Sequence, residues 1–248
     1  MESSNPVLQS KVFEQARIGV GQQSMTVQGT VNKTLVLLAV LLATAIWSWS
    51  MAASPSFRGM MPAALMISAI GGLVLALATS FKPQWAPVTA PLYAAFEGVF
   101  LGIVSVYFEM RYPGIVMKAV GLTFGVMLAM LMGYKSRFLQ ATPGLRKGLI
   151  IAMGGLMLFY AVVWIASMFH VVPPGFINGG GPLGIAFSLF VVGLAAMSLV
   201  LDFDFIESAA REGIDKKMEW YGAFALMVTL IWLYVEILRL MSKLNSRD

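Results

Sequence analysis

Seven long apolar segments, separated by short polar or Pro/Gly-rich connections, fill most of this 248-residue chain. A helix needs roughly 20 mostly apolar residues to cross the hydrocarbon layer of a membrane. The sequence therefore predicts an all-α, polytopic membrane protein folded as a seven-transmembrane-helix bundle. The expected spans are residues 34–53, 62–80, 87–108, 114–134, 147–169, 183–205 and 219–242.

The composition leaves no room for a separate soluble domain. Hydrophobic residues make up 58% of the chain and charged residues only 12%, whereas soluble domains are about 25% charged. We expect a cytoplasmic N-terminal segment at residues 1–32, a transmembrane domain at 33–243 and a short tail at 244–248.

The distribution of Lys and Arg predicts the orientation, because cytoplasmic loops carry the excess of these residues. One face would hold eleven of them: Lys11, Arg17, Lys33, Lys82, Lys135, Arg137, Arg146, Lys147, Arg211, Lys216 and Lys217. The other would hold six: Arg58, Arg111, Lys118, Arg239, Lys243 and Arg247. This bias places the N-terminus in the cytoplasm and the C-terminus outside.

The chain lacks the residues that several classes of membrane enzyme need. There is no cysteine, no Gly-x-Ser-x-Gly motif and one histidine, His170, at the end of the fifth span. The seventh span has no aspartate for an aspartyl protease dyad, and its lysine, Lys243, lies too near the end for a Schiff base. We expect no enzyme activity and no cofactor. No Lys/Arg run is dense enough for nucleic acid, so the expected partners are the lipid bilayer and other membrane proteins.

Small and aromatic residues predict details of packing. The pairs Gly98/Gly102 and Gly121/Gly125 have the spacing that lets membrane helices approach closely. Tryptophans near span ends would form an interfacial belt; these are Trp47, Trp49, Trp85 and Trp220.

A few acidic residues within the spans carry the functional signal, since an aspartate at the centre of a membrane helix costs about 2.5–3.5 kcal/mol. Glu97 lies roughly ten residues, or about 15 Å, into its span and so near the midplane. It must be protonated, paired or exposed to water in a cavity. A neutral glutamic acid bonded between helices is the structural alternative.

The last two spans hold the other candidates. Asp202 and Asp204 are two residues apart, about 200° around a helix, so at most one faces the bundle. Alternatively, both mark the interfacial end of the span. Thr229 and Glu236 share a face of the last span, and Glu236 can pair with Arg239 three residues on. An ordinary interfacial ion pair would also explain the latter two.

The segments LDFDFI at 201–206 and LMVTLIWLYVEILR at 226–239 resemble the transmembrane Bax inhibitor motif family, the Bax inhibitor-1-like proteins. The resemblance implies a pH-sensitive calcium leak channel in which aspartates on the sixth and seventh spans share a proton and close the pore. Asp202 occupies the first aspartate position, Thr229 the second, and Arg239 that of the family arginine.

Thr229 departs from this pattern because a threonine does not ionise. Two carboxylates in contact raise one pKa and create a switch near neutral pH; an aspartate facing a threonine does not. Either Asp202 pairs with Asp204 or Glu236, or the switch is weakened. Glu236 is disfavoured, because it lies about 10 Å beyond Thr229 along the helix.

We therefore expect a bacterial inner-membrane protein that passes cations, calcium being favoured by the resemblance. Calcium binds carboxylate oxygens, and Asp202 and Glu97 could offer transient contacts. One alternative is a non-transporting regulator that binds other membrane proteins, such as a protease or a secretion complex. Another, a proton-coupled carrier, would predict two related halves, which the sequence does not contain.

Overall fold

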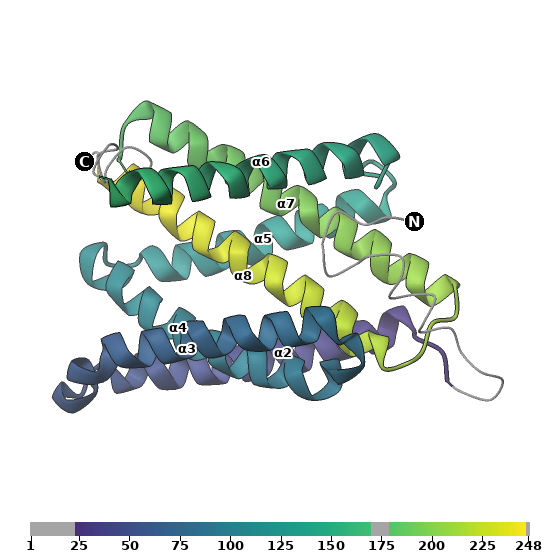
Figure 1. Cartoon of the computed structure of the whole chain (residues 1–248), viewed down its shortest axis with the longest axis horizontal. Helices are drawn as coiled ribbons and strands as arrows, with labels where there is room; N and C mark the ends of the chain where they lie inside the picture. The colour runs from purple at the N-terminus through teal and green to yellow at the C-terminus, as the bar shows by residue number, and fades with distance from the viewer. Residues whose placement is uncertain (1–22, 170–178, 247–248) are drawn as a thin grey trace. The chain divides into compact units, whose positions relative to one another are not determined.

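The computed structural model describes residues 23–169 and 179–246, and this part of the chain is entirely helical apart from one isolated β-bridge (Figure 1). Its helices are α2 (Val27–Met51), α3 (Pro55–Phe81), the short 3₁₀ helix η2 (Pro83–Trp85), α4 (Ala86–Arg111), α5 (Ile115–Lys135), α6 (Pro143–Met168), α7 (Pro182–Arg211) and α8 (Met218–Asn245). Seven are long and apolar enough to cross a membrane. The predicted fold class is confirmed. Lys11, Arg17, His170 and Arg247 lie outside the described residues.

The helices extend beyond the apolar segments because their ends are set by capping. Helix α2 begins at Val27, seven residues before the expected span, since the side chain of Thr26 accepts a hydrogen bond from the backbone N–H of Gly29. Helix α3 begins at Pro55, a residue type suited to the first helical turn. The connection expected between the first two spans, at residues 54–61, is therefore mostly helix. Helix α7 continues to Arg211 rather than ending at 205.

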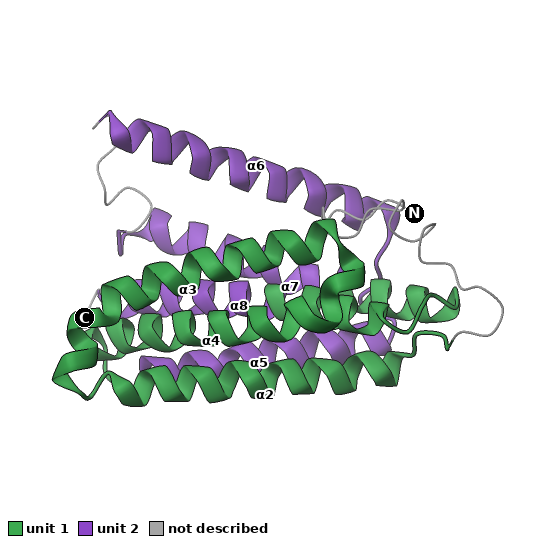
Figure 2. Cartoon of the chain, turned by 60° about the horizontal axis from the view of Figure 1, so that its bottom comes forward, with its two compact units in different colours: residues 1–113, 202–228 green, residues 114–201, 229–248 purple. Residues whose placement is uncertain are grey.

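The chain divides into two compact units (Figure 2). Unit 1 comprises residues 1–113 and 202–228, and unit 2 comprises residues 114–201 and 229–248. Along the chain, α7 passes into unit 1 at Asp202 and α8 passes into unit 2 at Thr229. The core of unit 2 joins α6 and α7 through Leu149, Leu156, Val191 and Leu194.

Unit 1 is built on close packing of α4 against its neighbours α2 and α3, which run beside it in Figure 1. A Cβ added at Gly98 would overlap the carbonyl oxygen of Leu41 on α2, and one added at Gly102 would overlap that of Ala45. The glycines therefore let the α4 backbone touch the α2 backbone. The close approach predicted for this pair is confirmed.

The second glycine pair, Gly121 and Gly125, does not bring two helix backbones together. No atom of another described element lies within 4 Å of a Cβ built at Gly121 or Gly125. The buried residues of α5 follow the stripe Ile115, Ala119 and Thr123. Gly121 lies two residues, or about 200°, from Ala119. The pair is therefore on the exposed side of its helix, and the predicted close approach is wrong within this part of the chain.

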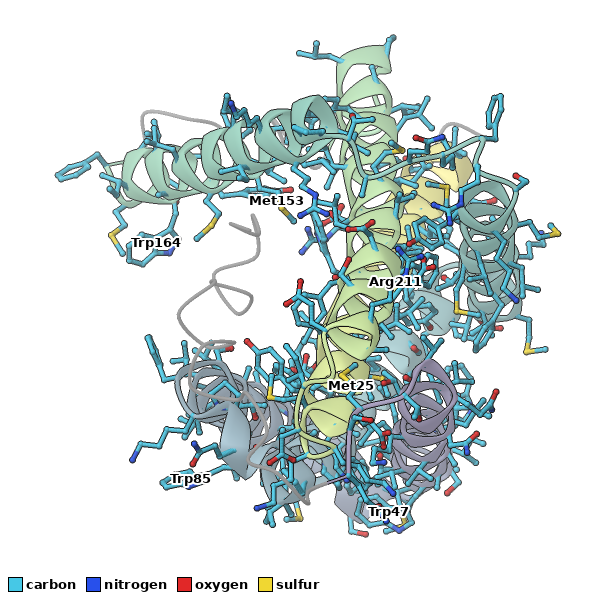
Figure 3. All side chains as sticks on the ribbon, turned by 90° about the vertical axis from the view of Figure 1, so that its right-hand side faces the viewer. Met25, Trp47, Trp85, Met153, Trp164 and Arg211 are labelled. Carbon is cyan, nitrogen blue, oxygen red and sulfur yellow. The ribbon has the colours of Figure 1, made fainter. Side chains whose placement is uncertain are left out.

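Two of the tryptophans expected at span ends lie at the outer surface of unit 1, as Figure 3 shows for Trp47 and Trp85. The ammonium group of Lys82 lies 4.5 Å from the Trp85 ring centroid. A ring with a cation beside it suits the boundary between lipid and water.

We predict that Gly98→Ala destabilises the protein by about 1–3 kcal/mol, the usual range for overpacking. The added methyl group would push α4 from the backbone of α2. Gly121→Ala is the matched control, because it makes the same chemical change where space is open and gains helix propensity. Thermal unfolding in detergent should show a lower Tm for Gly98→Ala alone. Equal Tm values would contradict the close contact.

Candidate functional site

The N-terminal segment of unit 1 pairs with the connection between α7 and α8. Ser24 and Asp215 form an antiparallel bridge, and the N–H of Met25 donates to the carbonyl of Ile214 at 2.6 Å. Both segments therefore lie at one end of unit 1. This agrees with the predicted topology, in which they share a face of the membrane.

Glu219, in the first turn of α8, places a fully buried carboxylate at this end. Its Oε1 atom accepts hydrogen bonds from the backbone N–H and the hydroxyl of Thr26, each at 3.0 Å, across 193 residues of sequence. Its Oε2 atom pairs with the ammonium group of Lys33, about two turns further along α2. A carboxylate here also suits the positive end of the α2 dipole.

Two further residues, Gly29 and Trp220, lie beside the Glu219–Lys33 pair. A Cβ at Gly29 would overlap the Glu219 side chain, so the glycine provides the space. Lys33 also lies 5.6 Å from the ring centroid of Trp220. The Lys33–Glu219 pair was not found from the sequence, because an acidic residue in a first helical turn is usually explained by that helix alone. The sequence around Glu219 also gives no sign of its hydrogen bonds to Thr26, which is 193 residues away.

Glu97 lies in the middle of α4 and faces α3. A Cβ at Gly72 would lie 2.7 Å from its Oε1 atom, so the absence of a side chain there accommodates the carboxylate. Glu97 is half-buried. Among the residues that the structure describes, no hydrogen bond or salt bridge engages its oxygens. The sequence left open a neutral Glu97 that is hydrogen-bonded between helices. The described residues do not form such a hydrogen bond.

Asp202 and Asp204 differ in burial, as their spacing predicts. Asp202 is 3% exposed, and Asp204 is half-buried. Asp202 shares a face of α7 with Ile206 and Ala209, at spacings of four and seven residues, and both of these belong to a core cluster of unit 1. Asp202 therefore continues that core face toward the middle of the helix.

Glu236 and Arg239 form the predicted ion pair within unit 2, with Arg239 Nη1 donating to Glu236 Oε1 at 2.9 Å. Glu236 is 3% exposed. One turn on, Lys243 is also buried, and its ammonium group donates to the hydroxyl of Ser188 at 2.7 Å and to the carbonyl of Gly184 at 3.1 Å. The Glu236 carboxylate is therefore buried while the Arg239 side chain is 46% exposed, and the Lys243 contact joins α7 to α8 one turn further on.

The six predicted site residues fall into both units. Unit 1 holds Glu97, Asp202 and Asp204, and unit 2 holds Thr229, Glu236 and Arg239. Thr229 is buried, and its pairing with Asp202 stays a prediction. Across residues 23–169 and 179–246, no three His, Asp or Glu side chains are grouped as a metal site.

A family model described as Bax inhibitor 1 like matches residues 5–246, which is nearly the whole chain. No curated protein matches the chain. No solved structure matches it either.

We predict that breaking the Lys33–Glu219 pair destabilises the protein strongly. Lys33→Met should cost about 3 kcal/mol, because the buried Glu219 carboxylate is left uncompensated. Glu219→Gln should cost less, because the Lys33 ammonium group is only partly buried. The double variant Lys33→Met/Glu219→Leu should lose less than the sum of the single changes. Tm values in detergent test this.

The control is Glu207→Gln, which breaks the more exposed Glu207–Arg211 pair on α7. Such a pair contributes only about 0.3–0.5 kcal/mol. If all single variants had the same Tm, the Glu219 contact would not hold α2 to α8.

Proposed function

This chain belongs to the Bax inhibitor 1 like family, and we propose that it works there as a passive cation leak channel, with calcium as its favoured ion. In this proposal it is an integral protein of the bacterial inner membrane, with its N-terminus in the cytoplasm. It acts without chemical catalysis and without a resident cofactor.

The observation that carries the proposal is the Glu97 carboxylate in the middle of a membrane helix. Glu219 and Glu236 show how this chain satisfies other buried carboxylates, with a cation and a hydrogen bond directly beside each. Glu97 has neither among the described residues. A carboxyl group at such depth is expensive, so its retention favours contact with water or a passing cation.

Asp202 supplies the second acidic group of the pathway. It is buried, it belongs to the same unit as Glu97, and it occupies the family position discussed above. Calcium takes six to eight oxygen ligands and binds tightly when several carboxylates converge. Two carboxylates at separate positions on α4 and α7 favour weak, successive contacts, which conduction requires.

We predict that Glu97→Gln and Asp202→Asn each reduce calcium flux about tenfold or more. The attraction between unit charges at 4 Å is about 4 kcal/mol at an effective dielectric constant near 20, and only 1.4 kcal/mol corresponds to a factor of ten. Calcium entry into proteoliposomes, followed with an internal dye between pH 5 and pH 8, measures this.

Glu212→Gln is the control, because it removes an equal charge from the exposed connection after α7. It should leave the flux unchanged. A native chain that passes no ion in liposomes would reject the channel and favour the non-transporting regulator. Native flux that survives both Glu97→Gln and Asp202→Asn would instead reject these residues as the pathway.

Thr229 sets the expected pH dependence. An Asp202–Thr229 hydrogen bond contributes about 0.5–1.5 kcal/mol, whereas a switch from 1:99 to 99:1 requires about 5.5 kcal/mol. We therefore predict a shallow pH dependence in the native chain. Thr229→Asp should create a steep transition, and Asp202→Asn in that background should abolish it.

Thr229→Asn is the matched control, since it adds an amide of similar size that does not titrate. A steep transition already present in the native chain, and lost in Asp202→Asn, would show that another acid partners Asp202. Glu97, Asp204 and Glu236 would then be replaced one at a time.

A further inference from the structure

Residues 23–25, which we call the strap, lie across the end of unit 1 where α7 is connected to α8. The N–H of Met25 donates to the carbonyl of Ile214 at 2.6 Å. The N–H of Lys216 donates to the carbonyl of Gln23 at 3.1 Å, and the ammonium group of Lys216 donates to the Gln23 side chain. The strap is therefore held to the connection as a short antiparallel pair.

The strap places the side chain of Met25 inside unit 1, where it is 2% exposed (Figure 3). A Cβ built at Gly222 on α8 would lie 3.4 Å from the terminal methyl group of Met25 and 3.3 Å from the side chain of Ile206 on α7. Gly222 therefore makes room for Met25 between these two helices. The other members of this core cluster come from α4, α7, α8 and the connection: Ala86, Ala209, Ile214, Met218 and Tyr221.

This cluster lies between Asp202 and the connection, because Ile206 follows Asp202 by one turn of α7. It contains no charged residue, and no group of the described residues pairs with the hydroxyl of Tyr221 within it. A cation that entered it would lose its hydration without gaining ligands, and apolar constrictions close channels in this way. The cluster therefore closes unit 1 on the side of Asp202 that faces the connection.

The strap is the part of this closure that can leave most easily. The helices α4, α7 and α8, which contribute most of the cluster, are 26 to 30 residues long. Short segments at the edge of a unit open locally at a lower free energy than packed helices separate. Thr26, the next residue, is held separately by Glu219. Release of the strap can therefore withdraw Met25 while α2 stays in place.

We propose that the strap is a gate. In the conformation described, Met25 closes the cation pathway on the cytoplasmic side of Asp202, and cations pass when residues 23–25 leave the connection. The gate rests on the proposed leak function and on the predicted orientation, whereas the release of the strap rests on neither. Met25 touches no proposed ion ligand, so its part in the pathway is to block it.

Met25→Ala tests the gate. Truncation leaves the closure unfilled and weakens the hold of the strap, so calcium flux into liposomes should rise about tenfold or more. Met61→Ala is the matched control, because it truncates another buried methionine of unit 1, in a cluster that the strap does not join. It should leave the flux at the native level. An unchanged or lower flux in Met25→Ala, or an equal rise in both variants, would overturn the gate.

A disulfide tests whether the strap must move. Ser24 and Asp215 are directly opposite in the antiparallel bridge, at a position that the two backbone hydrogen bonds flank. Side chains at such a position are close enough for a disulfide, and the chain has no cysteine of its own. Oxidation of Ser24→Cys/Asp215→Cys with copper phenanthroline should reduce the flux to that of protein-free liposomes, and dithiothreitol should restore it.

The single variants Ser24→Cys and Asp215→Cys control for the oxidant and should conduct equally with and without it. Mass spectrometry confirms that the disulfide has formed in the double variant. If the locked strap conducts as well as the reduced one, the strap does not gate the pathway.

Release of the strap is measured without ion flux. The thiol of Met25→Cys reacts with N-ethylmaleimide only when the strap leaves the cluster. Ser48→Cys is the matched control, because Ser48 is 0% exposed within α2 and its thiol reacts only when packed helices separate. In detergent, Met25→Cys should react about tenfold faster or more. Equal rates would overturn the release of the strap.

The outcomes separate the gate from the leak function. If Met25→Cys reacts fast but neither the native chain nor Met25→Ala nor the reduced double variant conducts ions, the leak function fails and takes the gate with it, while the movable strap stands. If the native chain conducts and the oxidised double variant conducts equally, the leak function stands and the gate alone is overturned.

Discussion

A polar group inside the hydrocarbon of a bilayer has no bulk water to bind, so it must find a partner within the chain. The backbone satisfies this condition by forming seven long helices. Side chains satisfy it singly, through contacts that the fold has to bring together. The buried carboxylate of Glu219 shows what this requires: a cation, a hydroxyl, a backbone N–H and a glycine that leaves space all converge on it.

The polar groups of the chain differ in how fully they are satisfied among the described residues. Glu219 holds the start of α2 to the start of α8 in unit 1, and Glu236 pairs with Arg239 in unit 2. Glu97 has no such partner among the described residues, and the Tyr221 hydroxyl has none either. Both lie in unit 1.

The chain belongs to the Bax inhibitor 1 like family, and Thr229 stands where the resemblance described above implies the second of two aspartates that share a proton. The proposed pathway based on Glu97 and Asp202 does not require such a dyad. In that case pH would change the charge of single carboxyl groups rather than move a coupled pair, and the response to pH would be gradual.

The sequence by itself determined the class of fold, the number of spans, the depth of Glu97 and the face of α8 on which Glu236 meets Arg239. Each of these follows from apolar length or from helical periodicity, which are local properties. The close packing at Gly98 and Gly102 was also predictable. The same spacing at Gly121 and Gly125 was misleading, because a small-residue pair does not reveal which side of its helix is covered.

Only the tertiary structure decided which distant residues meet. The contact of Glu219 with Thr26 spans 193 residues, and the solitary hydroxyl of Tyr221 is defined by neighbours from α4, α7 and α8. The accommodation of Glu97 by Gly72 likewise depends on how α3 packs against α4. Periodicity assigns a residue to one side of its own helix, whereas its partner depends on the packing of helices that the sequence does not place side by side.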